Sequence, residues 1–419
     1  MSTNATLKCQ LSLITALCLG NATALASVLV FDWSVTLLLV LYWLEAGILL
    51  VRTGVEGLLA EVPTEPFRDG YRIKLFERLE LGSKRGTVEI HDDLPPVHPR
   101  NTPAVLSLLR RVAVFWVPTG VVLLFVVPDS LAFDPVAVAL VSVGTLAFAY
   151  RHWSAFRRSF LDDRRYEEVS ASVVWPRRRF LWLAFLTFSA AVYGNPAVVS
   201  SADASGSVRT SVGAMFLFVA CCKLAYETYR VTIVGYPTRY EHRSGLLSFD
   251  WVSGSIGEER TAIESPESEP TAVFRTERRA VRVDGILYGL GYGILYPGSV
   301  GIAGIVLLIL ADVIGPVFGG LLVAGFVGSV VAGQIWLFDT QYGHLEYRVY
   351  SDELVVYDRK TDEPQLHVTS SDFREVSVSR GITQRLSGVG RLKLTQINGD
   401  VHVFRYLAEP DELAEKFRL

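Results

Sequence analysis

The chain has 419 residues, of which 50% are hydrophobic and only 20% are charged. This charged fraction is lower than the roughly 25% of soluble domains, and the mean hydropathy of +0.32 is positive. Much of the chain is therefore expected to lie outside water. This composition excludes disordered, collagen-like and disulfide-rich proteins. The 40 basic and 43 acidic residues give a formal net charge of −3, which argues against nucleic acid as a partner, because proteins that bind it present a basic surface.

The N-terminus carries an apolar segment that has two interpretations. Residues 11–19 followed by Ala24-Leu25-Ala26 have the pattern of a cleaved signal peptide. The apolar character continues through residues 28–31, which favours a retained first membrane span. The cysteines lack the Cys-x-x-Cys spacing of zinc and redox sites, so we interpret them as buried small hydrophobic residues; they are Cys9, Cys18, Cys221 and Cys222.

The sequence predicts about eight transmembrane helices. A helix needs about 20 mainly apolar residues to cross the hydrocarbon of a bilayer, because every backbone amide there requires a partner within the protein. The segments that meet this condition, or nearly do, are 11–31, 34–51, 112–127, 135–150, 180–200, 211–226, 292–310 and 316–338.

The distribution of basic residues orients these helices. Lysine and arginine are retained on the cytoplasmic side of a membrane, and 37 of the 40 basic residues lie in the connections 52–111, 151–179, 230–282 and 339–419. An even number of spans places all four connections on one side. We therefore expect a multi-pass protein of the cell membrane with both termini in the cytoplasm.

Glu45 is the only acidic residue well inside a predicted span, and an ionisable residue at such a position is a candidate functional residue. No base lies three or four residues away on its own helix, so Glu45 must be protonated, hydrated or paired across helices. Lys223, near the cytoplasmic end of the sixth span, is a candidate partner for which Glu227 competes. The interpretations are a structural clamp between helices, a proton- or ion-coupled site, and a side chain that reaches water.

The second span carries a motif that resembles a known family. Residues 38–45 read Leu-Leu-Val-Leu-Tyr-Trp-Leu-Glu, and Asp32-Trp33-Ser34 precede them. This pattern resembles an uncharacterised prokaryotic family of multi-helix membrane proteins that is well represented in halophilic archaea, and Lys223 is similar to a lysine of that family. The resemblance covers roughly residues 5–235. It implies an archaeal, halophilic membrane protein, and it brings no known activity.

Two further patterns lie at the membrane. Arg177, Arg178 and Arg179 directly precede the fifth span, which indicates a stop signal at the helix end or a basic cluster that faces anionic lipid. Glycines crowd the last hairpin, at 276–338, and include Gly285, Gly289 and Gly293 at every fourth position. Small residues allow close helix packing, so these glycines predict tight packing or a homo-oligomer face; a broken helix at Pro297 that lines a cavity is the alternative.

The C-terminal part predicts a small antiparallel β domain. Alternating or β-branched runs at 345–350, 353–358, 364–368, 374–379, 391–396 and 401–407 are separated by turn signals. Pro410 and the acidic residues after it suit the first turn of a final helix. The motifs Gly343-His344-Leu345-Glu346-Tyr347-Arg348-Val349 and Arg385 to Leu394, together with Phe274 to Ala280, resemble the bacterial pleckstrin-homology-like domain that follows a transmembrane hairpin.

These observations predict the domain organisation. It comprises a six-helix transmembrane domain at 1–235 with cytoplasmic loops at 52–111 and 151–179, a flexible polar linker at 236–275, a transmembrane hairpin at 276–338 and a cytoplasmic pleckstrin-homology-like β domain at 339–419.

No catalytic motif supports an enzyme. The sequence lacks HExxH, GxSxG, a P-loop and GxGxxG after a strand. His91-Asp92-Asp93 with His98 is the only cluster that resembles metal ligands, and we interpret it as an exposed loop, so neither a metal nor a cofactor is expected. The expected function is that of a scaffold in the lipid bilayer, with a protein partner or membrane surface bound through 339–419. The alternative is a transporter or proton-coupled sensor centred on Glu45.

Overall fold

The computed structural model describes residues 35–63, 81–126, 135–171, 221, 262–294, 301–303, 305–306, 315–381, 384–385 and 387–417. The chain divides into two compact units. Unit 1 draws on residues 1–69, 89–97 and 101–258, and unit 2 on residues 70–88, 98–100 and 259–419. Unit 2 therefore takes residues 70–88 from the stretch that the sequence analysis assigns to a loop of the six-helix domain.

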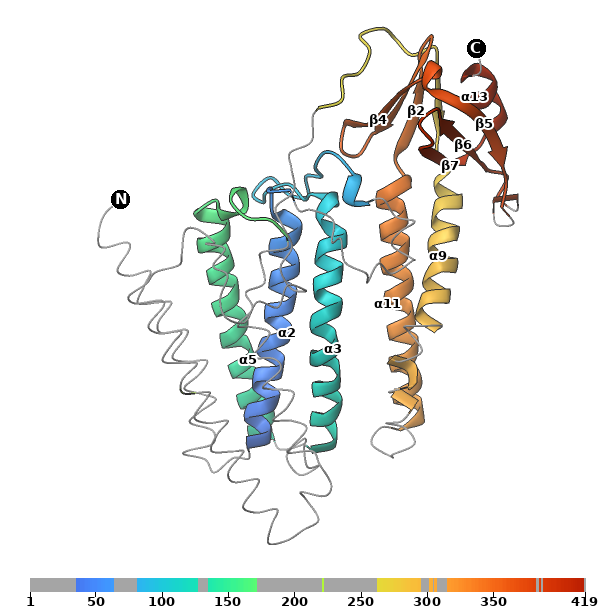
Figure 1. Ribbon diagram of the computed structural model, residues 1–419. Helices are drawn as coiled ribbons and strands as arrows, with labels where there is room; N and C mark the ends of the chain where they lie inside the picture. The colour runs from blue at the N-terminus through green and yellow to red at the C-terminus, as the bar shows by residue number, and fades with distance from the viewer. Residues whose placement is uncertain are drawn as a thin grey trace, which may run out of the picture. The chain divides into compact units, whose positions relative to one another are not determined.

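The described core of unit 1 consists of three helices that lie side by side in Figure 1. They are α2 (Val35–Leu59), α3 (Thr102–Val126) and α5 (Pro135–Ala155), and a π-helical segment η4 (Phe156–Asp162) continues α5. A helix of 25 residues, such as α2 or α3, is about 37 Å long. This exceeds the roughly 30 Å of hydrocarbon, so the helices extend beyond the apolar segments by which they were predicted.

Helices α2 and α3 are joined by a reciprocal tryptophan contact. The indole rings of Trp43 and Trp116 stack with centroids 4.6 Å apart, and each indole N–H donates to the backbone carbonyl of the other tryptophan, at 2.8 and 2.9 Å. Each ring also covers a glycine of the opposite helix, Trp43 over Gly120 and Trp116 over Gly47. Because the earlier residue of α2 meets the later residue of α3 and the reverse, the two helices run antiparallel. A side chain larger than that of glycine at either position would collide with the opposite ring.

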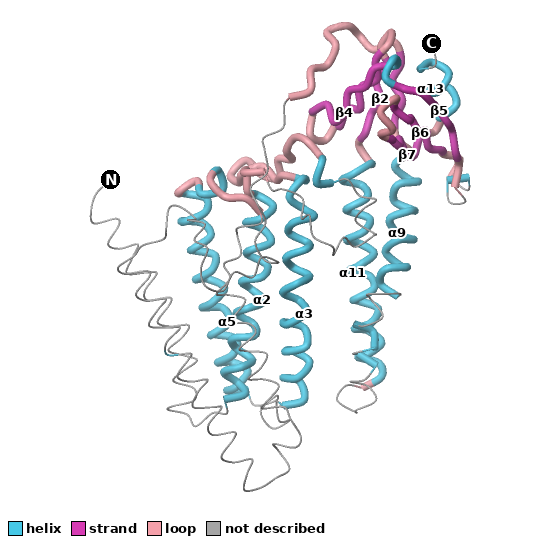
Figure 2. The backbone as a smooth tube through the Cα atoms, in the orientation of Figure 1, coloured by secondary structure: helices cyan, strands magenta, loops and turns pink. Residues whose placement is uncertain are grey.

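Unit 2 contains a helical hairpin of α9 (Arg278–Ile294) and α11 (Pro316–Tyr342), which Figure 2 shows side by side. Gly285, Gly289 and Gly293 of α9 lie against the backbone or side chains of Ile335, Val331 and Val327. A Cβ atom at Gly289 would lie only 2.6 Å from the Cα of Val331. These glycines therefore serve close packing within the chain. A homo-oligomer through the same hairpin stays a prediction.

Two antiparallel sheets form the rest of unit 2. Strands β1 (Ala272–Arg275), β2 (Leu345–Val349), β3 (Glu353–Asp358) and β4 (Glu363–Thr369) pair in that order, and β5 (Phe373–Ser379), β6 (Gly390–Gln396) and β7 (Val401–Leu407) form the second sheet. The 3₁₀ turn η7 (Ser370–Asp372) separates the sheets, and the helix α13 (Pro410–Phe417) ends the described chain. The rings of Tyr347 and Phe404, with centroids 5.3 Å apart, join the two sheets in the buried core.

The predicted β domain with its terminal helix is confirmed, and two details differ. The strands divide into a four-stranded and a three-stranded sheet, a division that the sequence pattern did not predict. Strand β1 lies within the stretch predicted as a flexible linker and precedes the hairpin, and it pairs with β2 through the register Ala272↔Val349 to Arg275↔Glu346. The hairpin is thus inserted between the first two strands of the sheet domain. Pairing with β2 orders a four-residue segment too short to be detected by its pattern.

Three described helices are long and apolar enough to cross a membrane, and they comprise Leu37–Leu59, Pro135–Asp162 and Gly319–Tyr342. These correspond to the spans predicted at 34–51, 135–150 and 316–338. The helix α9 begins at Arg278, before the span predicted at 292–310, because hydropathy does not detect its polar first turns. The spans predicted at 11–31 and 180–200, and all but Cys221 of the one at 211–226, lie outside the described residues.

Candidate functional site

The first candidate site is a buried polar cluster between α2 and α5. The Glu45 residue is 4% exposed, and its Oε1 atom accepts a hydrogen bond from the guanidinium of Arg151, which is 6% exposed. The Nε2 atom of His152 lies 3.6 Å from the same carboxylate oxygen. Toward the C-terminal end of α2, Arg52 Nε and Glu56 Oε1 form a second ion pair at 2.6 Å, with little exposure of either side chain.

The chemistry of this cluster allows two roles. The carboxylates of Glu45 and Glu56 balance the guanidinium groups of Arg52 and Arg151, so the four groups carry no net charge when all are ionised. Removing one member of a buried pair leaves an uncompensated charge, which costs about 3–5 kcal/mol, so one role that the Glu45–Arg151 pair allows is a structural clamp between α2 and α5. The imidazole of His152, whose Nε2 atom lies 3.6 Å from Glu45 Oε1, adds a further ionisable side chain to the cluster, and a proton-coupled site is the other role that such a cluster allows.

The structure describes only part of the predicted polar site. Glu45 is buried and pairs with a base on another helix, and that base is Arg151. Lys223 and the cluster Arg177, Arg178 and Arg179 lie outside the described residues. Sequence reasoning missed Arg151 because the residue directly follows the predicted span 135–150 and was counted among the bases of the next connection. Its position at the boundary of an apolar segment was the available signal.

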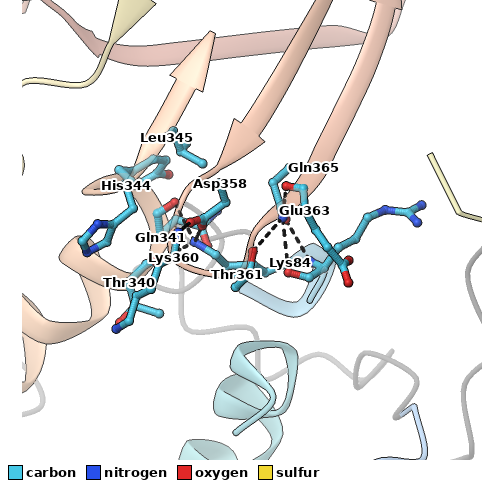
Figure 3. Close-up of polar contacts among 12 residues, drawn as sticks. Lys84, Thr340, Gln341, His344, Leu345, Asp358, Lys360, Thr361, Glu363 and Gln365 are labelled. Carbon is cyan, nitrogen blue, oxygen red and sulfur yellow. Dashed lines mark hydrogen bonds and ion pairs between the residues drawn. The ribbon is translucent and has the colours of Figure 1, made fainter. Parts of the chain in front are cut away.

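The second candidate site surrounds a buried lysine in unit 2, and Figure 3 shows it in close-up. Lys84 follows the short 3₁₀ turn η2 (Leu81–Ser83), and its Nζ atom lies 2.5 Å from Asp358 Oδ2 at the end of β3. The same ammonium donates to the backbone carbonyls of Thr340 and Gln341, in the last turn of α11. The Lys84 and Asp358 side chains are 3% and 0% exposed.

The electrostatics of this site favour a cation. The carbonyl end of a helix carries a partial negative charge, and the Asp358 carboxylate adds a full one. Asp358 is held in place by a hydrogen bond from the Lys360 N–H to its Oδ1 atom, at 2.7 Å. Burial lowers the pKa of the Lys84 ammonium below its ordinary value, and the nearby Asp358 carboxylate opposes that change. We name the cage formed by Thr340, Gln341 and Asp358 the lysine seat.

The two residues after Lys84 also contact β4 and the turn that precedes it. The side-chain amide of Gln365 accepts from the Arg85 N–H at 2.8 Å and donates to the Arg85 carbonyl at 3.2 Å. Gly86 has a φ angle of +79°, and a Cβ atom there would lie 2.7 Å from the Cβ of Thr361. Both the backbone conformation and the contact require glycine. Sequence reasoning missed this site because Lys84 and its partners lie far apart in the chain.

A third group of polar contacts joins the two helices of the hairpin to each other and the hairpin to the second sheet. Arg278 at the start of α9 makes two hydrogen bonds of 2.8 Å to the carboxylate of Asp339 in α11. The hydroxyl of Tyr406 in β7 donates to Asp284 Oδ2 of α9 at 2.9 Å. Tyr406 is 2% exposed and has a φ angle of +61°, which is uncommon for a bulky residue. Burial, followed by the negative charge of Asp284, raises its pKa.

The described residues contain no group of three or more histidine, cysteine, aspartate or glutamate side chains suited to a metal ion. His91 Nδ1 and Asp93 Oδ2, from the cluster considered in the sequence, are 3.7 Å apart, and both side chains are exposed. Such an exposed pair offers no enclosed coordination site.

Comparison with known proteins identifies a family for the larger part of the chain. A family model described as a family of unknown function (DUF6498) matches residues 6–228, which is more than half of the 419 residues. The match covers nearly the same stretch as the resemblance noted for residues 5–235, and it assigns no activity. No curated protein and no solved structure matches the chain.

Proposed function

We propose that this chain, which belongs to the DUF6498 family, is a multi-pass membrane protein that acts as a scaffold through its C-terminal sheet domain. Three apolar helices of spanning length support the membrane location. The concentration of 37 of the 40 basic residues in four connections supports eight spans with both termini in the cytoplasm. The sheet domain would then face the cytoplasm.

The architecture of unit 2 supports an interaction domain of the pleckstrin-homology-like type. Two antiparallel sheets, of four and three strands, are followed by the helix α13, and the pleckstrin-like plan is a bent β structure closed by a C-terminal helix. The hydrogen bond from Tyr406 of β7 to Asp284 of α9 fixes the domain to the hairpin. A domain held in this way presents its surface at a constant position beside the bilayer, which suits the capture of a partner.

The contacts between the sheet domain and a segment of the chain that is distant in sequence support the proposal most directly. The segment at residues 84–86 is more than 250 residues away in sequence from the end of α11. Asp358 and the end of α11 hold its lysine, Gln365 of β4 holds its backbone, and Thr361 lies against its glycine. Recognition of a segment through hydrogen bonds to its backbone and one anchored side chain is a common mode of protein interaction.

The proposal is tested by photo-crosslinking in cells with the full chain. A photoreactive residue replaces Ile397, which is 71% exposed beyond the end of β6, and the matched control replaces Leu321, which is 65% exposed on the apolar helix α11. We expect a discrete protein adduct from position 397 and only lipid adducts from position 321. Absence of any protein adduct from Ile397 and from a second position, Val403, would contradict the scaffold role.

The alternative function is a small-molecule or ion transporter, or a proton-coupled sensor, centred on Glu45. The specific observation in its favour is the burial of Glu45 beside Arg151 and His152 in helices of spanning length. The test is a flux assay in proteoliposomes that compares the parent chain with Glu45→Gln. Flux that the substitution abolishes supports the transporter. No flux in either protein, with a lower thermal stability of Glu45→Gln, supports a structural clamp.

A further inference from the structure

We propose that the lysine seat is a receptor for protein segments that carry a lysine followed two residues later by a glycine, and that residues 84–86 occupy it as a built-in competitor. A partner protein with such a segment would displace the chain's own segment. This inference rests on the proposed scaffold function, and it specifies both the binding surface and the chemistry of the partner.

The seat selects lysine by charge and by size. Two backbone carbonyls at the end of α11 and the Asp358 carboxylate converge on one ammonium group. An apolar side chain would leave Asp358, which is fully buried, without its positive partner. A guanidinium is a planar fork rather than a compact charge, so it does not fit acceptors that converge on one nitrogen. Acetylation would remove the charge and is expected to abolish binding.

Thr361, in the turn between β3 and β4, selects glycine two residues after the lysine. Gln365 of β4 tolerates different residues at the position between the lysine and the glycine. The positive φ of Gly86, and the 2.7 Å distance that a Cβ atom there would have to Thr361, exclude other residues at this position. Gln365 binds the backbone N–H and carbonyl of Arg85, groups that every residue except proline offers. The recognition element is therefore Lys-x-Gly, and the buried Leu81 three residues before the lysine is an additional anchor.

In the proposed exchange, a segment of the partner takes the place of the chain's own segment. The segment 84–86 lies between α2 and α3 in sequence, whereas the seat and Gln365, which bind it, lie between residues 340 and 365. A segment tethered to its receptor binds at a high effective concentration, about millimolar for short flexible links. The internal segment therefore blocks weak ligands, and a partner succeeds when it is locally concentrated or when the internal segment is weakened.

The experiment uses the full chain in detergent micelles and a fluorescent peptide of residues 81–88, Leu-Gly-Ser-Lys-Arg-Gly-Thr-Val. Binding is measured by anisotropy for the parent, for Lys84→Met and for Gly86→Ala. We expect both variants to bind the peptide at least tenfold more tightly than the parent, because each empties the seat by a different route. Adding Asp358→Asn to Lys84→Met should remove the gain. Peptides with acetyl-lysine, or with alanine in place of glycine, are the matched controls.

A second measurement does not depend on variants. Excess peptide added to the parent chain should speed hydrogen exchange at the Arg85 amide of the protein, because the displaced segment loses its bond to Gln365, and the alanine-containing peptide should leave exchange unchanged. Equal exchange with both peptides, or equal peptide binding by Lys84→Met with and without Asp358→Asn, would overturn the inference. A crosslinked partner at Ile397 without peptide binding would leave the scaffold role intact and refute only the lysine seat.

Discussion

The reciprocal contact between Trp43 and Trp116 provides a quantitative test of the packing in unit 1. The substitution Gly120→Ala places a Cβ atom 2.5 Å from Cζ2 and 2.8 Å from Cε2 of Trp43. Carbon atoms in contact are about 3.5–4.0 Å apart, so the indole must retreat by roughly 1 Å. That movement carries the Trp43 N–H away from the Trp116 carbonyl, to which it donates at 2.8 Å.

The expected cost follows from the opposing contributions. Overpacking costs about 1–3 kcal/mol, and loss of the hydrogen bond adds about 0.5–1.5 kcal/mol. Alanine in place of glycine gains about 1 kcal/mol of helix propensity. The net effect is a loss of about 1–3 kcal/mol in the free energy of unfolding, which corresponds to a fall in Tm of roughly 3–10 °C for a domain of this size.

The assay is thermal unfolding of the purified protein in detergent, followed by tryptophan fluorescence. Gly328→Ala is the matched control, because a Cβ atom at that helical glycine has no heavy atom within 4 Å, and it should not lower Tm. Gly47→Ala, with a distance of 2.9 Å to Trp116, should have a smaller effect than Gly120→Ala. Equal Tm values for Gly120→Ala and Gly328→Ala would refute the reasoning.

Three further predictions concern buried polar groups. Either Glu45→Gln or Arg151→Gln should lower the free energy of unfolding by about 3–5 kcal/mol, and the double variant should lose less than the two single effects combined; additive losses measured by thermal unfolding would show that the pair is not coupled. Tyr406→Phe removes the donor to Asp284 and should lower stability by about 1–3 kcal/mol, with no change in far-UV circular dichroism. Burial lowers the pKa of His98 to about 4 from 6.5, so the unfolded chain binds more protons between these values and stability should fall as the pH drops from about 6.5 to 4. His98→Asn should flatten that pH dependence of Tm, and an unchanged slope would exclude His98 as its source.

The strands of the sheet domain were predictable because their signal is local. Run 353–358 is rich in β-branched and apolar residues and run 401–407 largely alternates, both runs lie between turn signals, and β3 and β7 have those bounds. Strand β1 was not predictable in the same way, because only the pairing of Ala272–Arg275 with β2, across the inserted hairpin, makes it a strand.

The contacts at the candidate sites depend on residues that are distant in sequence. Glu45 was detectable as an acid in an apolar helix, but its partner Arg151 sits on another helix. In the sequence, Lys84 is one basic residue among others in a polar connection. Only the folded structure shows that Asp358 and the end of α11 enclose it. One signal was present and went unused. The spacing Trp-x-x-x-Gly occurs at Trp43–Gly47 and again at Trp116–Gly120. In the structure, the tryptophan of each motif packs against the glycine of the other.

The central claim is that apolar helices cross the membrane an even number of times and leave the sheet domain in the cytoplasm. It is tested most directly by fusing two reporters behind Leu419, one fluorescent only in the cytoplasm and one enzymatically active only outside it. The account predicts a fluorescent fusion without external enzyme activity. Active enzyme on intact cells, with no fluorescence, would contradict the topology and the cytoplasmic scaffold role that rests on it.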